Sequence, residues 1–235
     1  MTFTMKLTHT LASALLTLAS LCSTAVYAQN KGTVDFNNYR DYILKVKNEW
    51  KIPGIAAGVI KDGEVVFLEG FGEARPDGTP VNETTLFQIG SVSKSFTATL
   101  MARLVDEGKV KWDDTVKRIL PDLDLYDNWI EENLQVKDIM THRMGIKGQQ
   151  GTYIPNLGYS RDDVYKMMHL LKPGYSFRGS YEYNNITFII AQKIIEKLSG
   201  KSWEDNLKDV ILDPLGMYNT SANGEPFAAS PYAAV

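Results

Sequence analysis

Apolar residues recur at three- and four-residue steps along much of the chain, which is the spacing of a helix that buries one face. The first such stripe follows Asp35, the expected N-cap, and ends before Pro53, which cannot continue a helix. It predicts an amphipathic helix with five buried side chains: Phe36, Tyr39, Ile43, Val46 and Trp50.

The next two apolar runs are short and rich in β-branched residues, which favours strands. They extend from Gly54 to Ile60 and from Glu64 to Gly70, and Lys61, Asp62 and Gly63 separate them. Asp-Gly between two such runs is typical of a β-hairpin, because a tight primed turn needs positive φ. A helix followed by a hairpin therefore opens the chain.

After Val81 the pattern changes to helices with short connections, most of them ended by Gly or Pro. The stretch 221–235 is polar, rich in alanine and aperiodic, and we interpret it as a tail. Two strands alone make a marginal sheet with two open edges. The expected helices are Ser91–Asp106, Thr115–Leu120, Val136–His142, Asp162–Leu171, Ile186–Ser199 and Trp203–Ile211.

Composition and charge narrow the class of ligand. The chain has 235 residues, 44% of them hydrophobic, and a formal net charge of −3. This is a globular composition without the basic field that nucleic acid requires. His142 and His169 lack carboxylate or cysteine partners at ligand spacing, so we expect no metal and no cofactor, and a structural role for both. At the end of its helix, His142 is expected to bond terminal carbonyls. A small-molecule or peptide substrate is the expected partner.

Residues 1–28 have the pattern of a cleavable export signal. Lys6 supplies positive charge, an apolar run extends from Leu11 to Leu21, and Ala28 ends a stretch of small residues. Such a run is too short to span a bilayer, which needs about 20 residues. The single cysteine, Cys22, would be removed with the signal, and a lipid anchor on it is the less favoured alternative because Leu21 is bulky. We therefore expect a periplasmic or secreted protein.

The first chemical motif is a serine placed three residues before a lysine, Ser91 and Lys94, at the start of a predicted helix. Gly90 allows a tight turn into that helix, and the spacing puts both side chains on one face. A serine hydroxyl becomes a nucleophile when a neighbouring group takes its proton, and a desolvated lysine can serve. An N-capping serine beside a solvated lysine is the alternative, and the local pattern does not choose between the two.

The second motif, Tyr-Xaa-Asn, occurs at Tyr126–Asn128 and at Tyr183–Asn185. Only the second copy directly precedes a long amphipathic helix, which would hold it rigidly. In the functional interpretation Tyr183 is a general acid/base whose pKa is lowered by Lys94, and Asn185 orients the lysine and the substrate carbonyl. The first copy is predicted to be a turn in which Asp and Asn bond their own backbone.

Together with further motifs in the same order, these residues resemble the serine β-lactamase-like superfamily. The resemblance is to the group of class C β-lactamases, D-alanyl-D-alanine carboxypeptidases, other penicillin-binding proteins and related esterases, and it spans about residues 35–220. The segments that carry it are Ile52–Ala56, Lys61–Gly63, Phe87–Ala98, Lys111–Asp114, Leu120–Asp122, Met140–Gly145, Tyr181–Asn185, Leu198–Gly200 and Pro214–Met217.

The resemblance implies an α+β fold, in which an antiparallel sheet flanked by helices lies beside an all-helical lobe. It implies an acyl-enzyme on Ser91, formed from an amide, ester or β-lactam carbonyl, with Lys94 and Tyr183 as catalytic partners and Asn185 as the substrate-binding amide. The expected organisation is a signal peptide at 1–28, the helix and hairpin of the α/β lobe at 29–80, a helical lobe at 81–220 and a tail at 221–235.

One family feature is not found in the sequence. Family members carry a third motif, Lys or His followed by a small residue and Gly, on a later strand that also supplies one of two oxyanion donors. The residues after Asn185 contain no such motif, and Lys172–Gly174 comes too early and has a proline where a strand pairs. We therefore expect a C-terminally truncated member that lacks the last sheet strands. An inactive remnant that at most binds cell-wall peptide or acyl ligands is the alternative, and a separate C-terminal half is a candidate partner.

Overall fold

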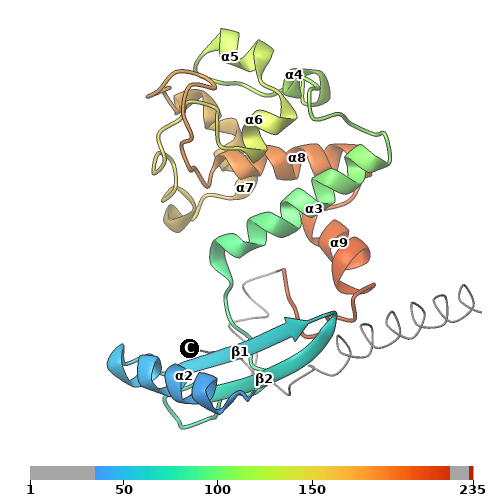
Figure 1. Cartoon of the computed structure of the whole chain (residues 1–235). Coiled ribbons are helices and arrows are strands. Elements are labelled where there is room, and N and C mark those ends of the chain that lie inside the picture. The colour runs from blue at the N-terminus through green and yellow to red at the C-terminus, as the bar shows by residue number, and fades with distance from the viewer. Residues whose placement is uncertain (1–34, 223–232, 235) are drawn as a thin grey trace, which may run out of the picture. The chain divides into compact units, whose positions relative to one another are not determined.

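The computed structural model describes residues 35–222 and 233–234. These residues divide into two compact units, one formed by 35–73 with 77–83 and the other by 74–76, 84–222 and 233–234. The first unit holds a helix and a hairpin, and the second is built from helices and their connections (Figure 1). The expected signal peptide at 1–28, with Cys22, and most of the expected tail lie outside the described residues.

In the first unit, the helix α2 extends over Asn37–Glu49. The N-cap is Phe36 and not the expected Asp35, because the Phe36 carbonyl accepts the first helical hydrogen bond, from the Arg40 amide at 2.9 Å. Asp35 lies one residue earlier, and its side chain accepts a hydrogen bond from the Asn37 amide at 2.9 Å.

Ile43 is buried with Phe67 and Phe71 of the hairpin. The predictions that Tyr39 and Trp50 are buried were wrong: their side chains are 38% and 76% exposed. The buried cluster of this unit consists of Ile43, Phe67 and Phe71, which is too small to cover the whole apolar stripe of α2.

The hairpin consists of the antiparallel strands β1, Gly54–Lys61, and β2, Glu64–Gly72. Asp62 and Gly63 form the two-residue loop with φ of +54° and +82°, so both have the positive φ that a type I′ turn requires. The predicted hairpin and its turn are confirmed, with strands slightly longer than expected. Gly70 has to be glycine, because a Cβ there would lie 2.2 Å from the carbonyl oxygen of Val81.

In the second unit, most helices agree in position with the predicted ones and are shorter at their ends. A 3₁₀ turn at Gly90–Val92 leads directly into α3. The α-helices are α3 (Ser93–Asp106), α4 (Val116–Ile119), α5 (Asn128–Asn133), α6 (Val136–Met140), α7 (Arg161–Lys166), α8 (Thr187–Ser199) and α9 (Trp203–Leu207), which continues as a π-helix over Lys208–Leu212.

Two predictions in this unit need correction. The expected turn at Tyr126–Asn128 is the start of α5, because the Asp127 side chain accepts the Ile130 amide at 3.0 Å and so caps a helix. The expected helix at 162–171 is two elements, α7 and a 3₁₀ turn at Met168–Leu170, because the chain leaves the α conformation at Met167 (φ −90°, ψ 1°). Both differences are local and leave the order of elements unchanged.

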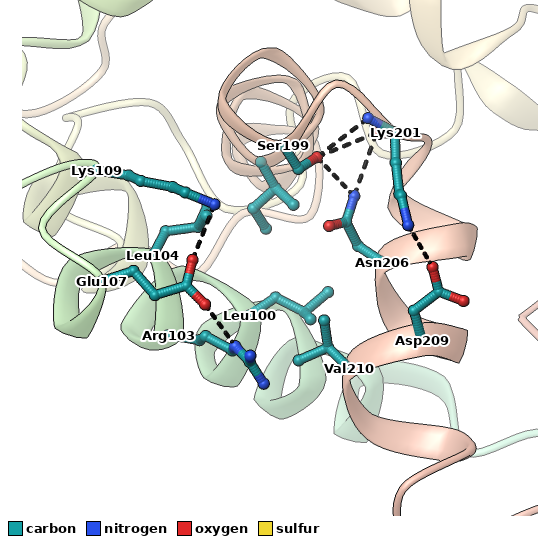
Figure 2. A pocket seen from close by; sticks show the side chains of 11 residues that line it. Leu100, Arg103, Leu104, Glu107, Lys109, Ser199, Lys201, Asn206, Asp209 and Val210 are labelled. Atoms are coloured by element: carbon teal, nitrogen blue, oxygen red, sulfur yellow. Dashed lines mark hydrogen bonds and ion pairs between the residues drawn. The ribbon is translucent and has the colours of Figure 1, made fainter.

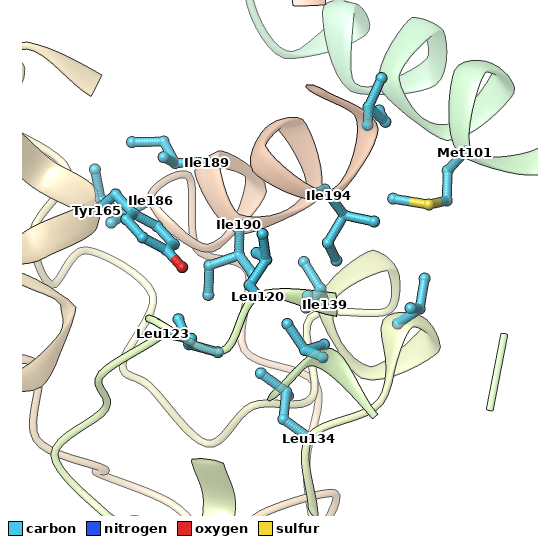
Figure 3. Packing of buried hydrophobic residues seen from close by; sticks show 14 of the residues in the cluster. Met101, Leu120, Leu123, Leu134, Ile139, Tyr165, Ile186, Ile189, Ile190 and Ile194 are labelled. Atoms are coloured by element: carbon cyan, nitrogen blue, oxygen red, sulfur yellow. The ribbon is translucent and has the colours of Figure 1, made fainter. Parts of the chain in front are cut away.

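The core of the second unit is built around α8 (Figure 3). Ile190 and Ile194 of α8 are fully buried, and Met101 of α3 reaches the same cluster. Leu134 and Ile139, from the α5–α6 region, are fully buried in the same core. Because α3 and α8 share this core, the residues that precede α8 and those that begin α3 are held in fixed relation.

Two features are absent from the described residues. None of the helices there has both the length and the apolarity to span a membrane. Nor do the described residues bring three or more His, Cys, Asp or Glu side chains together in a group that could hold a metal ion.

Shortening Ile190 tests the central place of α8. Ile190→Ala should lower the free energy of unfolding by about 2–5 kcal/mol, because it leaves a cavity among fully buried side chains, and Ile190→Val by about 0.5–1.5 kcal/mol. Urea denaturation followed by circular dichroism measures both. Lys197→Ala, on the exposed side of the same helix, is the control and should stay within about 0.5 kcal/mol of the parent. An equal loss of unfolding free energy in Ile190→Ala and Lys197→Ala would contradict the placement of Ile190 at the centre of the core.

Candidate active site

Ser91 lies in the 3₁₀ turn before α3, where its side chain is exposed. Gly90 has a φ of +51°, a conformation that favours glycine, and this allows the sharp entry into the turn. Neither the turn nor α3 has a side-chain cap hydrogen bond, so Ser91 does not act as the N-cap considered from the sequence.

Lys94, in the first turn of α3, connects the two sequence motifs. Its Nζ donates to Ser91 Oγ at 3.2 Å and to Asn185 Oδ1 at 2.6 Å. Nζ also lies 4.8 Å from the ring centroid of Tyr183 and 5.4 Å from that of Phe188, both within the range of a cation–π contact. One ammonium group therefore contacts residues separated by about 90 positions in the sequence.

Tyr183 is the second residue that contacts the Ser91 hydroxyl. Its hydroxyl donates to Ser91 Oγ at 2.5 Å. Burial raises the pKa of Tyr183, but hydrogen bonding with Lys94 and Ser91 and the positive charge of Lys94 outweigh it, so the pKa lies below its ordinary value. The Tyr183 phenolate thus forms more readily than that of a free tyrosine.

The structure brings all four predicted site residues together: Ser91, Lys94, Tyr183 and Asn185. Two come from the start of α3 and two from the segment just before α8. The second Tyr-Xaa-Asn copy is thus the one that meets Ser91, whereas Asp127 of the first copy caps α5.

Asn184, the variable position of the second Tyr-Xaa-Asn motif, was not among the predicted site residues. Its side chain is 1% exposed and donates through Nδ2 to the carbonyls of Lys147, at 2.8 Å, and Gln150, at 3.0 Å. Its Oδ1 accepts the Ile186 amide at 2.8 Å. Asn184 therefore fixes the start of α8 to the loop at 147–150. An asparagine just before a helix was the available signal, since Asn is a favoured capping residue.

His142 was expected to bond carbonyls at the end of a helix, and its observed contact is different. Its Nδ1 accepts the backbone amide of Asn184 at 3.2 Å. The imidazole is 7% exposed, and its centroid lies 4.6 Å from that of the Tyr183 ring. Burial, and then the nearby charge of Lys94, lower the pKa of His142 below its ordinary value. His169, by contrast, is exposed, with Nδ1 3.6 Å from an Asp124 carboxylate oxygen.

A separate depression of about 170 Å³ lies between α3, α8 and α9 (Figure 2). Its charged side chains are paired with one another: Glu107 with Arg103 and Lys109, and Asp209 with Lys201. Asn206 Nδ2 donates to Ser199 Oγ at 2.8 Å and to two backbone carbonyls. Because these polar groups satisfy one another, the depression is a structural junction between helices and not a second candidate site.

Comparison with protein families gives one matching family over most of the chain. The family described as Beta-lactamase matches residues 43–235. The unguisins hydrolase ungD' of Aspergillus campestris is 32% identical to the chain over 202 residues, which are 82% of this chain and 38% of that protein.

Solved structures of similar fold give the same result. A penicillin-binding protein homologue from Pyrococcus abyssi, described as octameric, matches 86% of this chain and 47% of its own with a TM-score of 0.71 and 30% identity. A class C beta-lactamase matches 80% of this chain and 50% of its own with a TM-score of 0.69 and 26% identity. The chain thus spans half or less of the length of each of these proteins. The chain shares the fold of these two structures over the matched residues, and its helices and short antiparallel sheet agree with the α+β class expected from the sequence.

Replacing Lys94 tests the electrostatics of the site. Lys94→Met should raise the pKa of Tyr183, because the hydrogen bond and the positive charge that favour the phenolate are lost while burial remains. Carbon-13 NMR of labelled tyrosine over a pH series measures the shift, with the resonance assigned through Tyr183→Phe. Lys147→Met, which removes another lysine of the same unit, should leave the pKa of Tyr183 unchanged. A Tyr183 pKa that is unaltered in Lys94→Met would contradict this account.

Proposed function

The chain belongs to the serine beta-lactamase-like superfamily, and we propose that it is a serine hydrolase that forms an acyl-enzyme on Ser91. One observation carries this proposal: Ser91 Oγ contacts both the Tyr183 hydroxyl, at 2.5 Å, and Lys94 Nζ, at 3.2 Å. A nucleophile, a base and a cation that activates the base are the groups that acyl transfer requires. The hydrolase and the class C beta-lactamase among the relatives support the same reaction class.

In the proposed first step, Ser91 Oγ attacks a carbonyl carbon and its proton passes to the Tyr183 phenolate oxygen. The positive charge of Lys94 favours that phenolate before the attack. The carbonyl electron pair moves to oxygen, and the tetrahedral intermediate then collapses. The leaving group departs with the proton from Tyr183, and the acyl group remains on Ser91 as an ester.

In the second step, water replaces the leaving group. Tyr183 takes a proton from the water molecule, the hydroxide attacks the ester carbon, and the carboxylic acid leaves as the proton returns to Ser91. Asn185 holds Lys94 in place through the 2.6 Å contact with its Oδ1. We propose that the Asn185 amide also orients the substrate carbonyl. The proposed substrate class is a small molecule or peptide with an amide, ester or β-lactam carbonyl.

A second candidate is binding of acyl or cell-wall peptide ligands without turnover. The exposure of Ser91 favours it, because water around a site weakens each electrostatic interaction in the reaction. A separate C-terminal half that covers the site is the proposed partner under this candidate. Turnover by the isolated chain separates the two candidates.

Mass spectrometry tests the nucleophile. Incubation with a penicillin and with an activated ester should add one acyl group to the chain, and Ser91→Ala should abolish the adduct because the attacking oxygen is removed. Ser95→Ala is the matched control: Ser95 lies in the first turn of α3, and its hydroxyl donates to the Val92 carbonyl, so the adduct should persist.

Three outcomes decide between the candidates. An adduct that persists in Ser91→Ala would exclude Ser91 as the nucleophile. An adduct on the parent that is released with measurable turnover would exclude the binding function. A parent chain that melts cooperatively and still forms no adduct would contradict the hydrolase proposal.

Export is the proposed route to the site of action, supported by the charge and apolar pattern of residues 1–28. Expression of the full chain in a bacterium should yield a protein outside the cytoplasm whose mass corresponds to cleavage after Ala28. Replacing three leucines of the apolar run with Asp should abolish both cleavage and export, because a charged segment does not form the apolar region of a signal. An uncleaved chain found only in the cytoplasm would contradict the proposal.

A further inference from the structure

We propose that His142 is a positioning residue that holds Tyr183 and Asn185 against Ser91 and Lys94 only while its imidazole is neutral, and that it thereby sets the acidic limit of the reaction. This inference rests on the proposed function. It assigns a role to a residue that has no contact with the reacting atoms of the proposed mechanism.

His142 bonds the chain on both sides of Tyr183. Its backbone carbonyl accepts the Glu182 amide at 2.9 Å, and its Nδ1 accepts the Asn184 amide at 3.2 Å. Tyr183 is the residue between these two amides. A shift of His142 would therefore displace the backbone that carries the Tyr183 hydroxyl and, one residue further, the Asn185 amide.

The same imidazole packs against the ring that carries the reacting hydroxyl. Its centroid lies 4.6 Å from that of Tyr183 and 5.1 Å from that of Phe188. Lys94 Nζ lies over these same two rings. His142 and Lys94 thus contact a common pair of aromatic side chains, so the position of one affects the surroundings of the other.

The contact with Asn184 requires the neutral tautomer with its proton on Nε2. An imidazolium carries a proton on both nitrogens, so its Nδ1 would face the Asn184 amide as a second donor. Protonation therefore replaces the hydrogen bond between Nδ1 and the Asn184 amide with a repulsion between two N–H groups. That hydrogen bond holds the backbone at 182–184. The backbone at His142 adds a constraint, because its φ of +55° lies in the left-handed region, which few non-glycine residues adopt.

The surroundings of His142 favour the neutral form. The ionisable groups that the described structure places against it are Lys94 from α3 and Tyr181 and Tyr183 from the segment before α8. None of these is a carboxylate that would stabilise an imidazolium. Burial and the charge of Lys94 both act against the cation.

Acidic pH should weaken both the reaction and the fold through His142. His142 is neutral above the ordinary histidine pKa of about 6.5 and stays neutral until the pH falls through its lowered folded-state pKa. Below that pH, protonation breaks the Asn184 contact and adds a cation near Lys94. The rate of Ser91 acylation should fall as the pH passes through that lowered pKa. The stability that the neutral form supplies should begin to fall earlier, below about pH 6.5, because the unfolded chain takes up the proton there, and it is lost once the pH has passed the lowered pKa.

Two substitutions at His142 distinguish the effect of its Nδ1 acceptor from the effect of its ring. His142→Asn keeps an acceptor close to the position of Nδ1, suits a positive φ and does not titrate. Its acylation rate at pH 8 should stay within about threefold of the parent, and the acidic inflection due to His142 should disappear. His142→Phe keeps a ring and loses the acceptor, so its rate should be about tenfold below that of the parent at pH 8, the size expected when a buried amide loses its partner, and it should lack the inflection due to His142.

The experiment measures the rate of adduct formation with an activated ester from pH 4.5 to 8. His169→Asn is the control, because His169 is exposed and lies near a carboxylate, and its profile should match that of the parent. A merely structural role for His142 would lower the stability of the variants without altering the profile. An acidic inflection that persists unchanged in His142→Asn would overturn the proposal.

A second measurement, NMR of His142 and Tyr183, does not depend on the acylation reaction. In the parent, nitrogen-15 NMR should show His142 with an unprotonated Nδ1, and the carbon-13 resonance of Tyr183 should shift as His142 titrates. That inflection should be absent in His142→Asn. A proton on Nδ1 of neutral His142 would overturn the inference. So would a Tyr183 resonance that does not shift as His142 titrates. A parent that shows both signals and forms no adduct would instead reject the proposed function and retain the coupling between His142 and Tyr183.

Discussion

The candidate site depends on the packing of α3 against α8. These two helices share a core in which Met101, Ile190 and Ile194 are fully buried. That apolar contact holds the first turn of α3 beside the segment that precedes α8. Without it, Ser91 and Tyr183 would be joined only by 92 residues of chain, and a contact of 2.5 Å would carry a large entropic cost. Hydrophobic burial thus supplies the free energy that keeps the polar groups close together.

Among the residues that this packing brings together, Lys94 has the largest electrostatic influence on its neighbours. It contacts the nucleophile, the acid/base and the orienting amide, and its charge lowers the pKa of Tyr183. The same charge acts on His142 in the opposite sense, because it favours a phenolate and opposes an imidazolium. One cation therefore sets both neighbouring groups to the ionisation states that the proposed reaction requires.

The residues that position the site are neutral and buried, whereas those proposed to react are partly open to solvent. Asn184 joins the start of α8 to the loop at 147–150, and His142 bonds the backbone on both sides of Tyr183. A buried amide with all its bonds made gives a defined geometry without a net charge near Lys94. Because positioning and reaction are carried out by different residues, the acidic limit of the reaction is expected to depend on His142, which has no contact with Ser91 in the proposed chemistry.

Short-range patterns in the sequence determined the hairpin with its Asp62–Gly63 turn, the positions of most helices and the contact between Ser91 and Lys94 at the entry to α3. Those features depend on φ preferences and periodicity within a few residues. The tertiary structure alone decided that Trp50 is exposed, that α5 begins at the predicted turn, and that Asn184 and His142 support Tyr183. The physical reason is that these outcomes depend on where a helix ends or on which distant backbone groups need partners. Such contacts between positions some forty or more residues apart are set by packing.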